Sequence, residues 1–392
     1  MANTLLTPTM VTRKALAVLH QKLRFVGSIN RQYDDSFAKD GAKIGDTLKI
    51  RLPNQYIVRT GATLSTQDTA ETSVSLQIAT QKGVDLNFTS SDLTLSLDDF
   101  SGRILEPAMA VLAAAIEADA LNMRKDVYQQ VNNPGSAITW NKVVTGRKKL
   151  QDSLTPDGNR TGLLCTQDSV DLLDATKSLF NDQERISAQY RSGVVADTAG
   201  FEFMESTHLS TQLRGTANGA YVVNGASQTG SSVTVSTGTG TIKQGEIITF
   251  AGCNMVHPET KADLGSLQQF VVTADYAGGA GSIPVSPAIV TTGATQNVTA
   301  SPANGGAVTI AGTASTNYGQ SLLFHENAFA FATADLVMPK GVDWGAREVY
   351  DGISMRIVRQ YDITQDKLPC RLDVLYGYKA IRPQLACRLA NN

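Results

Sequence analysis

The chain changes composition abruptly between Thr216 and Gly319, and this change restricts the possible folds more than any other feature. The segment holds 16 of the 33 glycines but only 6 of the 34 basic and 36 acidic residues. Short β-branched runs recur in it at intervals typical of a small sandwich or barrel. The runs are Ser232 to Ser236, Glu246 to Phe250, Phe270 to Thr273, Ser282 to Val285 and Ala307 to Ile310. A disordered linker is the competing interpretation, but such regular valines and isoleucines favour an inserted β domain, which we assign to 221–318.

The sequence well before this segment predicts one long amphipathic helix. Apolar side chains recur there at spacings of three and four residues, the pattern of a helix with one buried face. They are Leu105, Met109, Leu112, Ile116, Ala120, Met123, Val127 and Val131. Ser96 and Asp99 can form a capping box, and Pro107 is tolerated because it lies near the first turn. Such a helix is about 40 Å long, and we assign 91–135 to it.

Two strand patterns closer to the N-terminus frame a long connection. Apolar residues alternate with polar ones at Leu48, Ile50 and Leu52, and again at Val74, Leu76 and Ile78. The connection from Pro53 to Thr72 is longer than hairpin connections in compact domains usually are. It is either a mobile surface loop or a docking loop, and the sequence leaves both open. We assign 1–45 to an N-terminal arm of weak helical character and 46–90 to this extended β loop.

The remaining segments mix helix and strand patterns. Residues 136–220 predict helices from Val143 to Leu154 and from Ser169 to Phe180, around the apolar run Gly162 to Cys165. Residues 319–392 return to this character, with strand patterns from Phe324 to Phe331, Ile353 to Ile357 and Ile381 to Leu389. Three arginines at outward positions of these strands are expected to be solvated or paired across strands rather than to form a binding patch. They are Arg356, Arg382 and Arg388.

The charge balance disfavours a protein that holds nucleic acid by its overall field. The formal net charge is -2 at pH 7, which gives no drive for binding by counterion release. The N-terminus lacks a basic region followed by an apolar core, and the longest strongly apolar run, Ala108 to Ile116, is too short for a membrane span. We therefore expect a protein that has no membrane association and is made and kept in the cytosol.

No motif for catalysis or metal binding is present. His20, His208, His257 and His325 stand alone, and there is no G-x-S-x-G. The glycines at 238–240 and 278–281 lie among short strands and predict turns rather than a phosphate-binding loop. Asp34, Asp35 and Asp40 lack the ligand spacing of a calcium loop. We expect no enzyme, with no catalytic residue, no cofactor-binding residue and no metal site.

The cysteines point the same way. Cys165, Cys253, Cys370 and Cys387 form no C-x-x-C pair, so neither a zinc site nor a redox motif is indicated. An even number of cysteines leaves disulfides open, but buried free thiols are the expectation for a cytosolic chain of this size.

The order of the elements resembles that of a known family. Three segments carry the resemblance: GDTLKIRLP from Gly45 to Pro53, KQGEIITFAG from Lys243 to Gly252, and YGYKAIRP from Tyr376 to Pro383. Over nearly its whole length the chain is similar to the major capsid (coat) proteins of tailed bacteriophages with the Hong Kong phage type fold. It resembles the branch of that family in which the central domain carries an immunoglobulin-like insertion.

The resemblance implies an α+β fold with three parts. These are a peripheral domain with a long spine helix and the extended β loop, an axial α/β domain, and a small all-β immunoglobulin-like insertion. It also implies a structural subunit that self-assembles into hexamers and pentamers of an icosahedral capsid around double-stranded DNA. The implied partners are further copies of the chain, a scaffolding protein and a portal, with DNA contacted non-specifically and a decoration protein left open. The implied location is the virion, after assembly in the host cytoplasm.

Two other classes of function remain as alternatives. The Gly/Thr/Ser-rich β segment also suits a phage tail or fibre protein or a bacterial surface adhesin. The long helix and the single insertion disfavour this class, because adhesins usually contain repeats. An enzyme would need a convergent polar site, for which the sequence offers no candidate.

Overall fold

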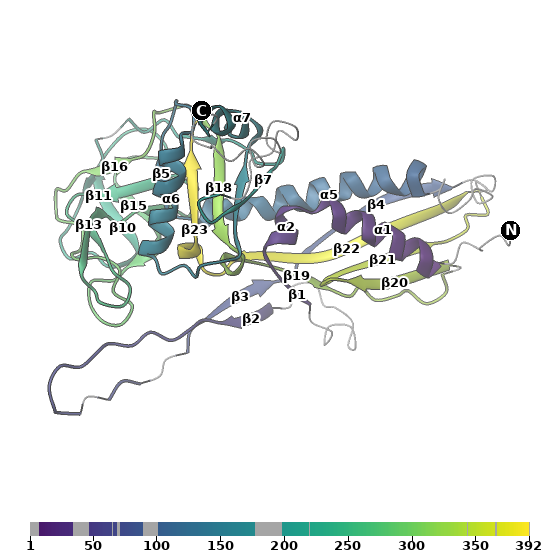
Figure 1. The fold of residues 1–392 in the computed structure, drawn as a ribbon, viewed down its shortest axis with the longest axis horizontal. Helices are drawn as coiled ribbons and strands as arrows, with labels where there is room; N and C mark the ends of the chain where they lie inside the picture. Colours follow the sequence, from purple (N-terminus) through teal and green to yellow (C-terminus); the bar gives the residue numbers. More distant parts are fainter. Residues whose placement is uncertain are drawn as a thin grey trace. The chain divides into compact units, whose positions relative to one another are not determined.

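The structure, a computed structural model, describes residues 8–33, 47–64, 66–68, 71–88, 101–176, 198–218, 220–342, 344–364 and 367–391. The chain forms two compact units, each assembled from segments that are distant in the sequence (Figure 1). The first unit comprises Met1–Ile50, Ser73–Asn122 and Phe329–Ile381, and the second comprises Arg51–Thr72, Met123–Ala328 and Arg382–Asn392. A few helices occur among many strands, which confirms the expected α+β class.

A six-stranded sheet organises the first unit, and β22 (Leu368–Ala380) is its longest strand. The others are β1 (Asn30–Tyr33), β4 (Thr80–Phe88), β19 (Phe329–Ala334), β20 (Trp344–Tyr350) and β21 (Ile353–Arg359). β22 pairs antiparallel with β4, β19 and β21, β20 pairs with β21, and β1 runs parallel to β19. The early strand β4 therefore pairs with the late strand β22 and not with a strand close to it in the sequence.

Two further strands, β2 (Thr47–Arg51) and β3 (Ser73–Gln77), pair with each other where the alternating patterns predict strands. The end of β3 lies directly on β22. A Cβ atom at Gly377 would lie 2.2 Å from the carbonyl oxygen of Gln77, so only glycine permits this approach. Gly377 of the YGYKAIRP segment therefore allows the end of β3, the strand that follows the long loop, to pack directly on β22.

Helices α1 (Pro8–Lys22) and α2 (Phe25–Ser28) confirm the helical character predicted for the arm. α1 buries Ala15, Leu16 and Leu19 and packs against α5 (Glu106–Leu121), β20 and β21. The arm is therefore part of the core of the first unit within its described residues.

The long helix is shorter than its apolar pattern predicts. α5 is preceded by a π-helical turn (η2, Ser101–Leu105) and followed by a 3₁₀ turn (η3, Asn122–Asp126). Val131 lies in β5 (Gln130–Asn132), so the prediction that the helix reaches this residue is wrong. The spacing of buried residues continues past the helix because Val127 and Val131 are buried in other structure. Pro107 lies in the first turn as expected, whereas Ser96 and Asp99 lie outside the described residues.

A buried polar group links three elements of the first unit. The Tyr376 hydroxyl in β22 donates to Asp119 Oδ2 in α5 at 2.6 Å, and Lys82 Nζ in β4 lies 2.7 Å from the same oxygen. Burial and the Asp119 carboxylate raise the pKa of Tyr376 well above its usual range, so the phenol remains a donor. Asp119 is therefore held by one neutral and one charged partner.

We expect Tyr376→Phe to lower the free energy of unfolding by about 1–3 kcal/mol, because the half-buried Asp119 loses the hydrogen bond from a fully buried hydroxyl-bearing side chain. Urea unfolding followed by circular dichroism measures the change. Tyr350→Phe is the control, since Tyr350 is 53% exposed and its hydroxyl should contribute little. Equal losses in the two variants would contradict a special role for the buried hydroxyl.

The second unit contains a five-stranded mixed sheet in the order β5, β23, β18, β6, β7. The new strands are β6 (Arg160–Leu164), β7 (Glu202–Glu205), β18 (Gln320–His325) and β23 (Ala386–Ala390). Helices α6 (Trp140–Asp152) and α7 (Thr166–Thr176) confirm the two predicted helices, although the predicted end at Phe180 lies outside the described residues. The core of this part includes Val143, Leu150, Leu172, Phe203, Leu323 and Leu389.

Two predicted strands of the C-terminal segment are interrupted. The pattern from Phe324 to Phe331 is divided into β18 and β19 by a 3₁₀ turn, η4 (Glu326–Ala328). The pattern from Ile381 to Leu389 becomes a strand only at Ala386, because Pro383 opens the 3₁₀ turn η5 (Pro383–Leu385).

The inserted segment is a closed antiparallel barrel. Its strands are β9 (Val222–Val223), β10 (Gly230–Thr237), β11 (Ile247–Phe250), β14 (Phe270–Val272), β15 (Gly281–Ile289) and β16 (Val308–Ile310). They pair in the order β16, β11, β14, β15, β10, β9. The ring closes because Val308 N–H donates to the Tyr221 carbonyl and Val223 N–H donates to the Gly306 carbonyl, both at 2.9 Å. This pairing is the barrel alternative, and it departs from the two packed sheets of an immunoglobulin-like domain.

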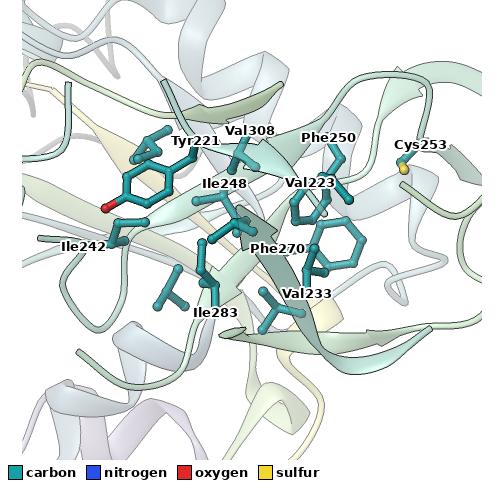
Figure 2. Close-up of a cluster of buried hydrophobic side chains, with 14 of the residues drawn as sticks. Tyr221, Val223, Val233, Ile242, Ile248, Phe250, Cys253, Phe270, Ile283 and Val308 are labelled. Carbon is teal, nitrogen blue, oxygen red and sulfur yellow. The ribbon is translucent and has the colours of Figure 1, made fainter. Parts of the chain in front are cut away.

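Buried aliphatic and aromatic side chains fill the interior of the barrel (Figure 2). They include Tyr221, Val223, Val233, Ile242, Ile248, Phe250, Phe270, Ile283 and Val308. The rings of Phe250 and Phe270 lie 5.5 Å apart between centroids, a favourable aromatic spacing. The barrel therefore has a hydrophobic core of its own.

Two short strand pairs complete the second unit. β12 (Asn254–Val256) pairs with β13 (Asp263–Leu267). β8 (Gln212–Leu213) pairs antiparallel with β17 (Asn317–Tyr318), so the chain enters and leaves the barrel through adjacent strands.

Candidate assembly surfaces

The connection between β2 and β3 is an extended ribbon that buries none of its described side chains, which are those of residues 52–64, 66–68 and 71–72. Four of them are large, apolar and exposed. They are Tyr56 at 56%, Ile57 at 45%, Val58 at 89% and Leu64 at 78%. Exposed apolar side chains that are grouped on one segment indicate an interaction site, whereas single scattered ones do not.

Hydrogen bonds across the ribbon hold its shape. Leu52 N–H donates to the Thr72 carbonyl at 2.8 Å, and Ile57 N–H donates to Gln67 Oε1 at 2.9 Å. Nearer the tip, the Arg59 guanidinium donates to the carbonyl of Thr63 at 3.1 Å. The ribbon is therefore preformed, and docking it elsewhere costs less ordering entropy than docking a disordered chain would.

A pocket of about 660 Å³, here called the junction pocket, lies in the second unit. Its walls come from η3, from β8 and the residues before it, and from two turns of the barrel segment. Arg124, Lys125 and Lys243 line it as cations, and Asp275 lines it as an anion.

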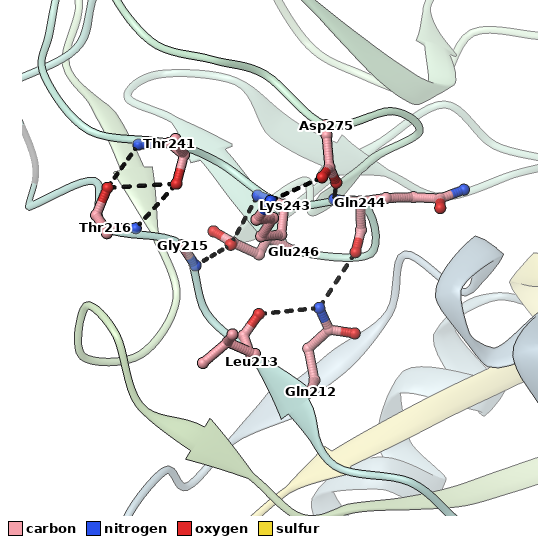
Figure 3. Close-up of polar contacts among 9 residues, drawn as sticks. All are labelled: Gln212, Leu213, Gly215, Thr216, Thr241, Lys243, Gln244, Glu246 and Asp275. Atoms are coloured by element: carbon pink, nitrogen blue, oxygen red, sulfur yellow. Dashed lines mark hydrogen bonds and ion pairs between the residues drawn. The ribbon is translucent and has the colours of Figure 1, made fainter.

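A carboxylate organises the turn beside this pocket (Figure 3). Glu246 Oε1 accepts the backbone N–H groups of Gly215 and Lys243, and it thereby joins the entry segment to the turn. Lys243 Nζ lies 2.8 Å from Asp275 Oδ2, and Gln244 N–H donates to Asp275 Oδ1 at 2.8 Å. Burial raises the pKa of Glu246 although both N–H donors act against this change. The hydrogen bond from Lys243 lowers the pKa of Asp275.

Two arginines lie buried near this turn. Arg124 is 2% exposed, and Arg388 in β23 is fully buried. Arg388 is therefore not solvated, and its expected outward placement is wrong, but its Nη1 donates across strands to Gln320 Oε1 of β18 at 3.2 Å. Arg356 is paired across β21 and β22 with Asp373 at 2.6 Å, as expected. Burial, with repulsion from Arg124, lowers the pKa of Arg388 to about 9, so it stays charged at neutral pH. Arg382 is half-buried.

The family described as P22 coat protein, gene protein 5, matches residues 9–388 of the chain. The chain belongs to the P22 coat protein family. It is a structural subunit of a tailed-phage capsid, which confirms the expected function, and the tail, fibre or adhesin alternative is not favoured. The comparison with curated proteins gave no match.

Solved chains similar to this coat protein come from several phages. One from Mycobacterium phage Che8 is 14% identical with a TM-score of 0.48, over 94% of this chain and 90% of that chain. One from the capsid of Cyanophage P-SCSP1u is 11% identical with a TM-score of 0.43, over 90% and 84%. One from the mature capsid of bacteriophage PhiM1 is 9% identical with a TM-score of 0.45, over 94% and 87%. The family assignment rests on the sequence match alone.

Three histidines of the coat protein make hydrogen bonds that stabilise its fold. His20 Nε2 lies 2.7 Å from Asp351 Oδ2, His257 Nδ1 accepts two backbone N–H groups of its own turn, and His325 Nδ1 accepts the N–H of Asn327. His208 is exposed. Asp34, Asp35 and Asp40 lie outside the described residues. Elsewhere in the described part of the chain, no three His, Cys, Asp or Glu side chains converge as a metal site would require.

The cysteines and the turn glycines of the coat protein lie in the environments that the sequence predicts. Cys253, Cys370 and Cys387 are buried free thiols, and Cys165 is a half-buried one. Burial raises the pKa of Cys253 and Cys387 to about 11. The predicted turn glycines 238, 240, 278 and 279 all have positive φ. Among the helices that the structure describes, none is long and apolar enough to cross a lipid bilayer.

Proposed function

We propose that this coat protein assembles with copies of itself into hexamers and pentamers that tile an icosahedral shell around double-stranded DNA. The observation that carries the proposal is the preformed ribbon between β2 and β3, which presents Tyr56, Ile57, Val58 and Leu64 to solvent. Burial of such exposed apolar surface against a neighbouring subunit lowers the free energy of the assembly. A contact between two different surfaces of one chain closes into rings when the rotation allows.

The near-neutral charge supports the same function. A net charge of -2 gives a shell wall that does not clamp packaged duplex through counterion release. Contact with DNA is then non-specific. Self-association, rather than DNA binding, drives assembly.

The test places charges on two exposed apolar residues of the ribbon, Val58 and Leu64, which are not part of the hydrophobic core of the subunit. The double variant Val58→Asp/Leu64→Asp should yield at least about tenfold fewer closed particles, because an interface hot spot then receives two unpaired charges. Sedimentation through sucrose and negative-stain microscopy measure the yield.

The matched control is Gln55→Asp/Thr66→Asp, which places the same charges at polar, exposed positions of the same ribbon. It should assemble nearly as the wild type does. Normal particle yield from the apolar-site variant, with its fold intact by circular dichroism, would refute the docking role.

We also propose the domain organisation, with an arm at 1–45, an extended loop at 46–90, a spine helix in 91–135, an axial domain at 136–220, an insertion at 221–318 and a return at 319–392. The adjacent entry and exit strands and the separate core of the barrel support the insertion. The family further suggests a scaffolding protein, a portal and a decoration protein as partners, and assembly in the host cytoplasm. A purely structural role without catalysis fits this proposal.

A further inference from the structure

We propose that the junction pocket is a binding site for a phosphate-type oxyanion, built around the buried guanidinium of Arg124. Its volume of about 660 Å³ falls within the range of small-molecule sites.

Arg124 is the residue that points to a ligand. Its Nη2 donates to the carbonyls of Ser210 at 2.9 Å and Thr211 at 3.2 Å. Its Nε and Nη1 are buried and have no hydrogen-bond partner among the described residues. A buried guanidinium with unused donors is unfavourable. Because Nε and Nη1 are themselves covered, an anion in the pocket that Arg124 lines would offset the charge of the guanidinium rather than accept from these two atoms.

Arg388 adds positive charge behind the same turn. Its Nη1 donates to the Gly245 carbonyl at 2.8 Å and to Gln320 Oε1 at 3.2 Å, whereas Nε and Nη2 have no partner within the described chain. Gly245 in turn lies against Lys125, since a Cβ there would be 3.2 Å from Lys125 Cβ. The field of Arg388 therefore reaches the wall of the pocket that Lys125 forms.

The neighbouring carboxylates offset only part of this charge. Asp275 is occupied by Lys243 Nζ and by Gln244 N–H, and Glu246 Oε1 takes two backbone N–H groups. Asp126 is close enough to favour the charged form of Arg388, but it does not line the pocket. The lining keeps three cations against one anion.

The other lining groups suit phosphate. Ser210, Thr211 and Thr273 also line the pocket, and the Ser210 hydroxyl accepts from Arg124 Nη2. Hydroxyl, guanidinium and ammonium groups can all donate to a tetrahedral oxyanion. Among the described lining residues there is no aromatic ring on which a base could stack. Recognition would therefore act on the phosphate itself, whether it is free or part of a nucleic acid backbone.

The test is calorimetric titration of the full-length protein with sodium phosphate, against sodium chloride of equal ionic strength. Lys125→Gln and Arg124→Gln should each weaken phosphate binding by about tenfold or more, because each removes a positive charge from the lining of the pocket. Lys340→Gln, an exposed lysine that does not line the pocket, should leave it within twofold. If Arg124→Gln fails to fold, Lys125→Gln decides alone.

Two further arms separate the sources of the ligand. A short DNA duplex at equal phosphate concentration tests the backbone, and a hexaglutamate peptide tests a carboxylate partner. Binding of free phosphate or of the duplex that weakens in the variants supports the proposal and names the source. Binding of hexaglutamate alone, no binding of any probe, or binding that the variants leave unchanged would overturn it.

Discussion

Phe270→Ala should lower the free energy of unfolding of the inserted barrel by about 3–5 kcal/mol, the usual cost of removing a buried phenylalanine ring. Phe270 is fully buried in β14, lies opposite Ile248 in β11, and packs on the ring of Phe250. Because the barrel is closed, its neighbours are held on both sides and cannot collapse fully into the cavity.

Thermal and urea unfolding of the full chain and of the 221–318 fragment measure this effect. The fragment should melt cooperatively on its own, since Cys253 has no partner in it and its core needs no disulfide. Leu267→Ala is the control, because Leu267 is 42% exposed in β13 and should change stability by about 0.5 kcal/mol or less. Random-coil chemical shifts for the fragment would contradict an independent domain.

The stability of the first unit should fall as pH rises from about 5 to about 8, through the titration of Glu117. This residue of α5 is 1% exposed, and Val26 N–H donates to its Oε1 at 3.1 Å. Burial raises the pKa of Glu117 from 4.5 to about 7, against the backbone N–H donors of the arm. The folded state therefore holds the proton more tightly than the unfolded state does. The resulting stability is complete below pH 4.5 and is lost as pH passes 7, a difference of about 3 kcal/mol.

Urea unfolding at several pH values between 5 and 8 measures this dependence. Glu117→Gln should remove most of it, because the amide does not titrate. Glu106→Gln changes an exposed carboxyl at the start of the same helix and should keep the wild-type dependence. A slope that is the same in Glu117→Gln and in the wild type would disprove the assignment.

The strands of the barrel were predictable because their signals are local. Five of its strands overlap the β-branched runs of the sequence, since alternating valines and isoleucines must place one face inward. The closure was not predictable. It depends on the hydrogen bonds that join Val308 to Tyr221 and Val223 to Gly306, and no local pattern identifies which distant edges will meet.

The longest strand, β22, escapes prediction for a different reason. Asp373 is fully buried in it and is neutralised by Arg356 from the next strand and by Arg371 from its own. Residues 368–372 alternate between buried and exposed, but every residue from 372 to 377 is buried, so the alternation covers only the first part of this long strand.

The junction pocket lies beyond sequence reasoning for a third reason. Its residues come from four separate stretches of chain that only the fold brings together. The buried arginine behind this pocket was also placed wrongly from the sequence. Every residue of β23 is buried, and Arg388 lies among apolar neighbours in it. Assigning arginine outward by alternation misses a strand that is covered on both faces.

The discontinuous make-up of both units sets an order on folding during synthesis. The sheet of the first unit needs β22, and the five-stranded sheet of the second needs β23 between β5 and β18. The first sheet cannot be completed until the ribosome has made residue 380, and the second until it has made residue 390. The barrel is one uninterrupted stretch with its own core, so it can be finished while those strands are still missing. A nascent chain would then carry one folded barrel and two incomplete sheets, whose unpaired edge strands can form non-native pairs with other chains.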